Sequence, residues 1–248
     1  MQEKGLAVVI LAAGKGTRMK SPLAKVLQPL CGQPLLQYVL KTVDTLHPDR
    51  LICVVGHQAD EVRTRFHCEE IEFVEQREQL GTGHAAMQAV NALSGFAGDI
   101  LVLCGDMPFI RTETLKSLIS KRRDSGAAMS VLTLLCPGPK DFGLIRRDGT
   151  GKMIGIIEQR DASEEEKKID EFNSGVYCFD SALFLKALDS LGRDNAQQEY
   201  YLTDAVQYMV RNGYDVVSVE TESVTEILGI NSPEDLKQAE AIWGDLSA

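Results

Sequence analysis

The stretch LAVVILAAGKGTRM, residues 6–19, decides the fold. Its first part, Leu6 to Ala12, is a short apolar run that favours a buried strand. Gly14 and Gly16 follow directly, and a glycine-rich turn after a strand is typical of a loop that binds phosphate through backbone N–H groups. Glycine lets the backbone approach an anion without a side-chain clash. The stretch therefore predicts the first strand of an α/β sheet with an anion-binding loop at its carboxyl end.

Short apolar runs and helical patterns alternate through the first half of the chain. Apolar residues recur at helical spacing in residues 35–46, and residues 85–93 and 114–123 suit further helices. Strands that alternate with helices are typical of a parallel sheet covered on both faces, so we expect a doubly wound α/β sheet. The expected strands are Leu6–Ala12, Leu51–Gly56, Ile71–Glu75 and Ile100–Cys104.

The pattern changes after Gly126, where strands follow one another with turns and one charged loop between them. This half predicts a lobe of mixed sheet built onto the first half. Ser232, Pro233 and Asp235 then predict a terminal helix, with a capping hydroxyl, a proline at the first helical position and a carboxylate. The expected strands of the lobe are Ala127–Cys136, Gly143–Arg147, Met153–Glu158 and Ser174–Phe179.

Composition excludes several classes of protein. The 248 residues are 44% hydrophobic and 25% charged, as in an ordinary globular chain. A formal net charge of −10 works against a nucleic-acid partner, because phosphate backbones attract basic surfaces. No stretch approaches the ~18 uninterrupted apolar residues of a membrane helix, and the first residues are no signal peptide. The six cysteines form no CxxC pair and predict buried thiols in a reducing compartment. We expect a cytoplasmic protein with no membrane partner.

Charged side chains follow two of the predicted strands. Arg18 and Lys25 come after the glycine loop and would add positive charge for a phosphate. The loop is neither GxGxxG, since Met19 replaces the third glycine, nor GxxxxGK[ST], and taken alone it is also compatible with a tight turn beside solvated cations. Asp106 follows the fourth strand, where open α/β sheets bind ligands, and a carboxylate there suits Mg²⁺. An isolated Gly-Asp pair is also a common turn.

Amide and imidazole side chains follow the third predicted strand. Gln76 offers both a hydrogen-bond donor and an acceptor, and Gly81-Thr82 opens the next helix beside it. Alone, Gln76 would be an ordinary polar residue. The four histidines show no metal-site spacing, and His84 is expected to start or pack the helix rather than act as an acid or base.

An ordered set of motifs resembles the sugar-nucleotide pyrophosphorylase family. The family signature LxxGxGTRMxxxxxK is matched by residues 11–25. Within the family, the chain is similar over essentially its whole length to the uridylyltransferase domain of the bifunctional N-acetylglucosamine-1-phosphate enzymes. The segments that carry this likeness are Gln76, Gln79–Ala85, Gly105-Asp106, Glu158, Asn173, Glu199–Asp204 and Asn231.

The resemblance implies a fold, a reaction and a role for each motif residue. The fold is Rossmann-like, a doubly wound mixed sheet of the nucleotide-diphospho-sugar transferase type with a sugar-binding lobe. The reaction is Mg²⁺-dependent transfer from UTP to N-acetylglucosamine 1-phosphate in cell-envelope precursor synthesis. Residues 1–231 would form the nucleotidyltransferase domain, with a nucleotide-binding half (1–126) and an acceptor-binding lobe (127–231), before a helix at 232–248. The implied residues are Arg18 and Lys25 for catalysis, Leu11, Ala12, Ala13, Gly14, Gly16, Gln76, Gly81 and Thr82 for the nucleotide, Gly143, Glu158 and Asn173 for the sugar, and Asp106 and Asn231 for the metal.

The sequence departs from the family at four positions. Ala24, Cys104, Leu144 and Gln198 stand where the family has proline, an aromatic residue, arginine and glycine, and two of them, Cys104 and Leu144, are expected on the acceptor side. The acetyltransferase β-helix of the bifunctional relatives is not found after residue 243, so a monomer or weak dimer is expected. Another sugar phosphate as acceptor and a non-catalytic nucleotide-binding regulator are the alternatives.

Overall fold

The computed structural model describes residues 4–67, 70–137 and 142–247. Short 3-10 helices lie at Thr17–Met19, Lys25–Leu27 and Glu166–Lys168. The α-helices are α1 (Leu35–Asp44), α2 (Ala59–Arg65), α3 (Thr82–Met87), α4 (Thr112–Ser125), α5 (Ser181–Ser190), α6 (Asp204–Arg211) and α7 (Pro233–Ser247). The strands are β1 (Gly5–Ala12), β2 (Pro29–Leu30), β3 (Gln33–Pro34), β4 (Arg50–Val55), β5 (Glu72–Glu75), β6 (Gly98–Cys104), β7 (Met129–Leu135), β8 (Leu144–Arg147), β9 (Met153–Ile157), β10 (Glu171–Asp180) and β11 (Val216–Thr221).

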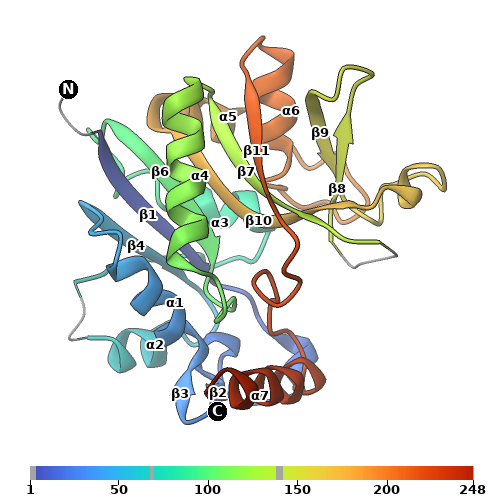
Figure 1. The fold of residues 1–248 in the computed structure, drawn as a ribbon. Coiled ribbons are helices and arrows are strands. Elements are labelled where there is room, and N and C mark those ends of the chain that lie inside the picture. The colour runs from blue at the N-terminus through green and yellow to red at the C-terminus, as the bar shows by residue number, and fades with distance from the viewer. Residues whose placement is uncertain (1–3, 68–69, 138–141, 248) are drawn as a thin grey trace.

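One mixed sheet forms the centre of the molecule (Figure 1), with the strand order β11-β7-β10-β6-β1-β4-β5. Strands β6, β1, β4 and β5 are parallel, as expected for a doubly wound fold. Strand β10 runs antiparallel to both of its neighbours, β6 and β7, and β11 is parallel to β7. The chain leaves β1 toward β4 on one side and later returns to β6 on the other. The predicted doubly wound mixed sheet is confirmed, and its switch point lies between β1 and β6.

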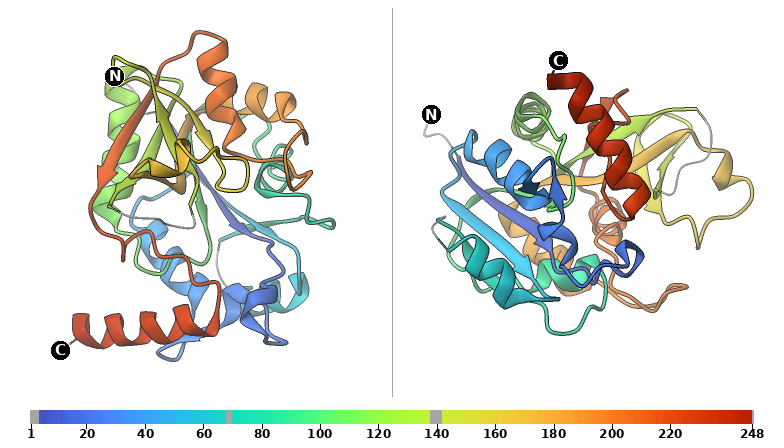
Figure 2. Two further views of the ribbon diagram at one scale, coloured as in Figure 1. Left: turned by 90° about the vertical axis from the view of Figure 1, so that its right-hand side faces the viewer. Right: turned by 90° about the horizontal axis from the view of Figure 1, so that it is seen from below.

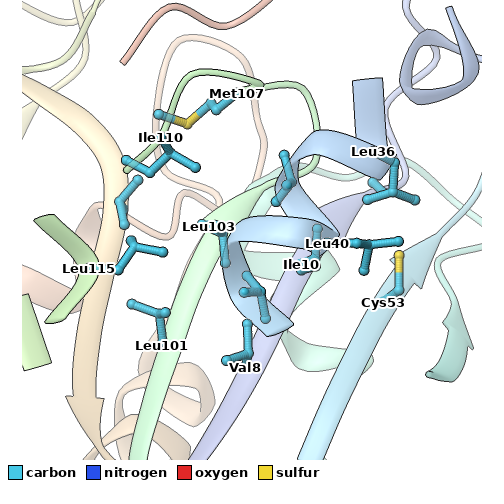
Figure 3. Packing of buried hydrophobic residues seen from close by; sticks show 14 of the residues in the cluster. Val8, Ile10, Leu36, Leu40, Cys53, Leu101, Leu103, Met107, Ile110 and Leu115 are labelled. Atoms are coloured by element: carbon cyan, nitrogen blue, oxygen red, sulfur yellow. The ribbon is translucent and has the colours of Figure 1, made fainter. Parts of the chain in front are cut away.

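The two faces of the sheet are buried in separate hydrophobic clusters. Val8 and Ile10 of β1 lie in the cluster covered by α1, α2 and α4, and Figure 3 shows α1 packed over β1 and β6 in this cluster. Ala7 and Val9 lie in the cluster on the other face, with α3, α5 and α6. A strand that is apolar at every position fits this arrangement, because successive side chains point to opposite faces. Each fully buried Leu, Ile or Val contributes roughly 1.5–3 kcal/mol.

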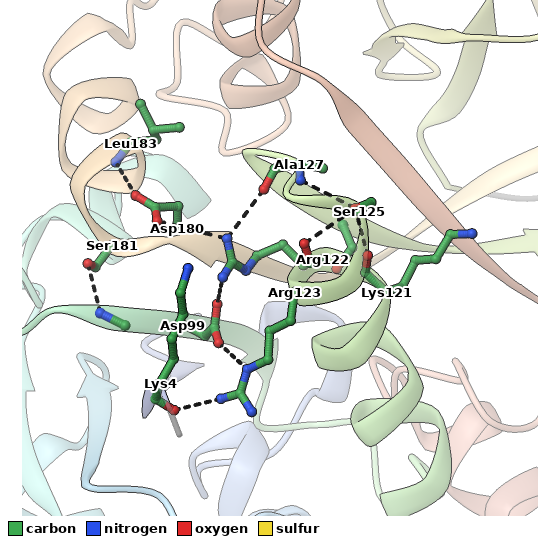
Figure 4. A network of polar contacts seen from close by, with 12 residues as sticks. Lys4, Asp99, Lys121, Arg122, Arg123, Ser125, Ala127, Asp180, Ser181 and Leu183 are labelled. Atoms are coloured by element: carbon green, nitrogen blue, oxygen red, sulfur yellow. Dashed lines mark hydrogen bonds and ion pairs between the residues drawn. The ribbon is translucent and has the colours of Figure 1, made fainter. Parts of the chain in front are cut away.

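A buried ionic network holds the C-terminal end of α4 to the start of β6 (Figure 4). Asp99 is fully buried and forms ion pairs with Arg122 and Arg123. Arg123 also donates to the carbonyl oxygen of Lys4 at 2.8 Å. The network lies at the amino end of the parallel strands, at the opposite edge of the sheet from the switch point, where ligands of such folds bind.

The second half contains elements beyond the expected strands. Strands β7 to β10 lie where they were predicted, and α5, α6 and β11 follow them in residues 181–221, for which no element was predicted. The Asp180 carboxylate caps α5 by accepting from the N–H groups of Ala182 and Leu183 at 3.1 and 3.3 Å. In the first half, the helix predicted over residues 85–93 is also displaced, since α3 ends at Met87 and turns follow it.

Helix α7 begins at Pro233, as predicted. The N–H of Asp235 donates to Oγ of Ser232 at 3.1 Å, and the N–H of Ser232 donates back to Oδ2 of Asp235 at 2.9 Å, which completes a capping box. Figures 1 and 2 show α7 as an outer helix beside β2 and β3. The ring of Trp243 packs 4.6 Å from that of Tyr38 between centroids, in a third hydrophobic cluster that attaches the helix.

The thiols are less uniformly buried than expected. Cys53 and Cys178 are buried, but Cys31 is exposed, Cys104 and Cys136 are half-buried, and Cys68 lies outside the described residues. Among the described residues, no helix is both long and apolar enough to cross a membrane.

Candidate active site

The candidate site lies at the carboxyl ends of β1 and β6, where the sheet has its switch point. Strand β1 leads into the glycine loop, and β6 leads into Gly105 and Asp106. A cavity of about 260 Å³ opens between these segments. The fold therefore gathers most of the predicted nucleotide-binding residues around one space. The predicted residues that line it are Leu11, Ala12, Ala13, Gly14, Lys25, Gln76, Gly81, Thr82 and Asp106.

The glycine loop turns back against Lys25. Gly16 has φ 59°, and a Cβ at this position would lie 2.8 Å from Cβ of Lys25, so glycine is required. The N–H of Met19 donates to the carbonyl of Gly16 at 2.9 Å, and the buried Met19 side chain fixes the turn. Gly14 is exposed, with open space where a side chain would stand. Arg18 is exposed on this turn and lies outside the cavity lining.

Lys25 lies between two oxygen atoms from distant parts of the chain. Its ammonium forms an ion pair with Asp106 and donates to Oδ1 of Asn231 at 3.0 Å. Burial disfavours the charged ammonium, but the Asp106 carboxylate more than offsets this and raises the pKa of Lys25 above its ordinary value. Lys25 is therefore a fixed positive charge at neutral pH.

Asp106 and Asn231 have the chemistry of ligands for a hard divalent cation. The N–H of Ile230 donates to the carbonyl of Asp106 at 3.0 Å, which holds the two segments together. The amide nitrogen of Asn231 donates to the carbonyl of Gly229 at 2.9 Å, so Oδ1 is the atom turned toward the ammonium. Mg²⁺ prefers such oxygens and takes its other ligands from water and phosphates. No cluster of three or more His, Cys, Asp or Glu in the described residues could hold a metal, so water or substrate oxygens would have to complete the coordination of a cation here.

Asp235 supports the Asn231 backbone from the first turn of α7. Its Oδ2 accepts from the N–H groups of Asn231 and Ser232, both at 2.9 Å. The start of α7 was predicted from the sequence, but the hydrogen bond between the Asp235 carboxylate and the Asn231 N–H was not. One carboxylate thus caps the helix and fixes a predicted metal ligand.

Gln76 and Gly81 form the side of the cavity expected to hold a base. Gln76 is 3% exposed, and its amide nitrogen donates to the carbonyl of Gly81 at 3.0 Å. Gly81 has φ 107°, and a Cβ there would lie 2.5 Å from the carbonyl oxygen of Tyr200. Only glycine meets both constraints, since the backbone angle and the close approach each exclude a side chain.

The segment 199–203 clamps this turn from the second half of the chain. The carbonyl of Tyr200 accepts from the N–H of Gly83, and the N–H of Tyr200 donates to Leu80, both at 2.8 Å. Oγ1 of Thr82 accepts from the N–H of Leu202 at 3.2 Å, which gives this predicted nucleotide ligand a structural role as well. Just before the segment, Gln198 has φ 54°, a left-handed backbone conformation that favours glycine.

Gly143, Glu158 and Asn173 also come together, around the ends of β8, β9 and β10. The N–H of Asn173 donates to the carbonyl of Gly143 at 2.7 Å, and a Cβ on Gly143 would lie 3.5 Å from Oε1 of Glu158. Thr203 donates to Oε1 of Glu158 at 3.0 Å. The Asn173 amide donates to the Tyr177 hydroxyl at 2.8 Å, and burial raises the pKa of Tyr177, which keeps that hydroxyl protonated. Neither of these two supporting contacts was predicted from the sequence.

The two departures expected on the acceptor side differ in position. Cys104 lines the cavity beside Lys25 and Asp106, and burial raises the pKa of its thiol to about 12. Leu144 is instead fully buried in the first hydrophobic cluster, together with Phe172. The leucine therefore packs β8 against β10 next to Gly143 and does not line the cavity.

Residues 8–136, just over half of the chain, match the family model of the MobA-like NTP transferase domain. The match contains the glycine loop, Lys25, Gln76, Gly81 and Asp106. The chain belongs to the MobA-like NTP transferase family. As a member of this family it is a nucleotidyltransferase, and the cavity at the switch point is its candidate active site.

Similarity to individual relatives extends further along the chain. It is 44% identical to the bifunctional protein GlmU of Pelobacter propionicus over 240 residues, which are 96% of this chain and 52% of the relative. It is 45% identical to GlmU of Pelotomaculum thermopropionicum over 239 residues, 95% of this chain and 51% of the relative. The chain thus spans about half the length of these curated relatives. The resemblance to the bifunctional enzymes is confirmed.

A solved structure shares the fold. A Bacillus anthracis structure described as a glucose-1-phosphate thymidylyltransferase, in complex with sucrose, superposes with a TM-score of 0.76 at 18% identity and covers 96% of this chain and 95% of its own. At this identity the likeness shows the Rossmann-like fold alone.

Proposed function

We propose that the chain transfers a uridylyl group from UTP to N-acetylglucosamine 1-phosphate, with Mg²⁺, and releases pyrophosphate. The observation that carries the proposal is the convergence of Lys25, Asp106 and Asn231 beside the cavity that Gln76 and Gly81 line. A cation site and a base site within one cavity suit a nucleoside triphosphate. The similarity to GlmU over almost the whole chain supports the choice of UTP and of the amino sugar.

The proposed donor site extends from Gln76 to the glycine loop. Oε1 of Gln76 and the N–H of Gly81 would bind the uracil edge. Backbone N–H groups near Gly14 and Gly16 would bind phosphate oxygens, and Arg18, exposed on the same loop, would face the leaving pyrophosphate.

The proposed acceptor site is the group of Gly143, Glu158 and Asn173. Glu158 accepts hydrogen bonds from sugar hydroxyls, and Asn173 and the Gly143 backbone bind polar groups of the same sugar. Because Thr203 and Tyr177 already hold the Glu158 and Asn173 side chains, the site loses little side-chain entropy when the sugar binds.

The chemistry requires positioning and charge rather than a protein nucleophile. A phosphate oxygen of the sugar 1-phosphate attacks the α-phosphorus of UTP as the bond to pyrophosphate breaks, in line. Asp106 and Asn231 would hold a divalent cation, which supplies positive charge to the phosphate oxygens when bound. Lys25 would then turn its ammonium to the α-phosphate, where charge develops.

Pyrophosphate release tests the proposal. Purified protein is assayed with Mg²⁺ and UTP, CTP, GTP or dTTP, each with N-acetylglucosamine 1-phosphate or glucose 1-phosphate. We expect release only with UTP and N-acetylglucosamine 1-phosphate. Release with another pair would correct the substrates, and UTP binding without release would support a regulatory protein.

A further inference from the structure

The orientation of the Gln76 amide is fixed by its surroundings. The carbonyl oxygen of Gly81 can only accept a hydrogen bond, so the Gln76 atom 3.0 Å from it must be the amide nitrogen, Nε2. The carbonyl oxygen, Oε1, receives no hydrogen bond from the described residues. Since Gln76 is almost fully buried and lines the cavity, Oε1 is the polar atom left for a ligand.

His84 takes the second hydrogen of the same amide. Its Nδ1 lies 3.1 Å from Nε2 of Gln76. An amide nitrogen does not accept hydrogen bonds, so Nδ1 must be the acceptor. One amide hydrogen is directed to Gly81 and the other to His84, so the observed orientation of the Gln76 amide is favoured over the inverted one. Inversion would place Oε1 against two acceptors, the Gly81 carbonyl and Nδ1 of His84, whereas without His84 only the Gly81 carbonyl would oppose it.

The ring of His84 is itself held on two sides. It stacks against Tyr200, with 6.0 Å between ring centroids and 27° between planes. On the other side Nε2 lies 3.2 Å from the amide nitrogen of Gln88, which also donates to the His84 carbonyl at 2.9 Å. A neutral ring accepts at one nitrogen only, so the two amides compete for it. Gln88 is half-buried, so the second hydrogen of its amide can turn to solvent while the first stays on the His84 carbonyl. Gln76 is almost fully buried and has no such alternative, so Gln76 retains the bond to Nδ1.

We infer that His84 is a positioning residue that sets base selectivity by keeping Oε1 of Gln76 turned toward the base, an inference that rests on the proposed function. An acceptor at this place suits uracil or thymine, because their N3 carries a hydrogen. Cytosine has an unprotonated N3, which would face Oε1 as a second acceptor. The inverted amide would present N–H instead and would suit cytosine.

The test measures how well UTP and CTP serve as substrates for variants that replace the His84 ring. Steady-state pyrophosphate release with N-acetylglucosamine 1-phosphate gives kcat and KM for wild type, His84→Phe, which keeps a flat ring, and His84→Asn, which keeps an acceptor. We expect His84→Phe to reduce the preference for UTP over CTP by about fivefold to tenfold, the scale of one neutral hydrogen bond, through KM rather than kcat. His84→Asn should restore most of the preference.

The matched control is Gln88→Leu, which removes the contact at the other ring nitrogen. Gln88→Leu should leave the preference for UTP over CTP within twofold of the wild-type value. An unchanged preference in His84→Phe, or equal losses in His84→Phe and Gln88→Leu, would show that the ring only packs the helix and would overturn the inference. If His84→Phe does not fold, as judged by thermal unfolding, His84→Leu takes its place.

Calorimetric binding of UTP and CTP separates this inference from the proposed reaction. If the wild type releases no pyrophosphate but binds UTP more tightly than CTP, and His84→Phe loses that difference, the reaction is wrong and the inference holds. If the wild type binds both nucleotides equally, the inference fails even where pyrophosphate is released.

Discussion

Nζ of Lys25 lies 3.0 Å from Oδ1 of Asn231, although 206 residues separate them in the sequence. The same ammonium pairs with Asp106. In this arrangement Lys25 takes the place between two oxygens that we assign to a divalent cation. An ammonium and a metal ion cannot share it, because like charges at such distances repel. Metal binding therefore requires Lys25 to move away, and the phosphate of a nucleotide is its natural new partner.

Replacing Lys25 with methionine should raise the affinity of the nucleotide-free protein for Mn²⁺ by about tenfold, since the competing charge is gone. Electron paramagnetic resonance of free Mn²⁺ measures this. Turnover with UTP should fall by ~10²-fold, as for the loss of one preorganised charge. Arg18→Met is the control, because Arg18 is an exposed charge on the neighbouring loop, outside the cavity lining. An equal rise of Mn²⁺ affinity in both variants would show that the loss of any nearby positive charge is enough, and would contradict direct competition by Lys25.

Asp106→Asn should lower activity and shift the Mg²⁺ titration to higher concentrations, because an amide oxygen is a weaker ligand than a carboxylate. The change is nearly isosteric, and the backbone bond from Ile230 to residue 106 remains. Circular dichroism should therefore match wild type. An unaltered Mg²⁺ titration would refute the ligand assignment.

Asp235→Ala should cost about 1 kcal/mol of unfolding free energy through the lost helix cap. It should also weaken Mn²⁺ binding severalfold, because Asn231 loses its backbone partner. Glu234→Ala is the matched control, since Glu234 is an exposed acidic residue in the same turn. Denaturant unfolding and metal titration measure both effects. Equal metal affinity in the two variants would contradict the link to Asn231.

Asp99→Asn should destabilise the protein by about 3–5 kcal/mol, because Arg122 and Arg123 lose the carboxylate that compensates their burial. The network lies at the far edge of the sheet, so KM for UTP should stay unchanged at temperatures where the variant is folded. Asp124→Asn, an exposed change on the same helix, should alter stability by no more than about 0.5 kcal/mol. Urea denaturation measures the free energy of unfolding of both variants, and equal values would contradict the prediction.

Cys104 should resist alkylation although it borders the cavity. Burial, together with the nearby Asp106 carboxylate, raises the pKa of its thiol to about 12, and only the thiolate reacts. At pH 8 iodoacetamide should modify the exposed Cys31 well before Cys104, as mapped by mass spectrometry. Reactivity of Cys104 should increase only as pH rises toward 12. Equal labelling at pH 8 would show that the thiol is not buried in solution.

Local signals explain why much of the site was predictable. The apolar run of β1 specifies a strand, and Gly14 and Gly16 specify a turn a few residues later. Asp106 follows β6 in the same way, and parallel neighbours end at one edge of the sheet, so the topology alone brings the glycine loop and Asp106 together. The positive φ of Gly16 and its contact with Lys25 then supply the physical reason for that glycine.

Contacts between distant segments were not predictable from local patterns. The bonds of Asp235 to Asn231, of Thr203 to Glu158 and of Tyr200 to Gly83 join residues whose proximity depends on the finished fold. Helix α5 is different, because the Asp180 cap and the apolar pattern after it are local signals within the sequence.

The place of β10 in the sheet has a consequence for a chain that grows from its N-terminus. Strand β6 pairs with β1 on one edge, but its other edge pairs with residues 177–180 of β10. Until the ribosome has released that segment, Ile100 to Cys104 form an apolar strand with one open edge. Such edges recruit other strands and cause aggregation. The nascent protein therefore has to be shielded for some 75 further residues of synthesis after β6, roughly 4–15 s at the usual rate of elongation.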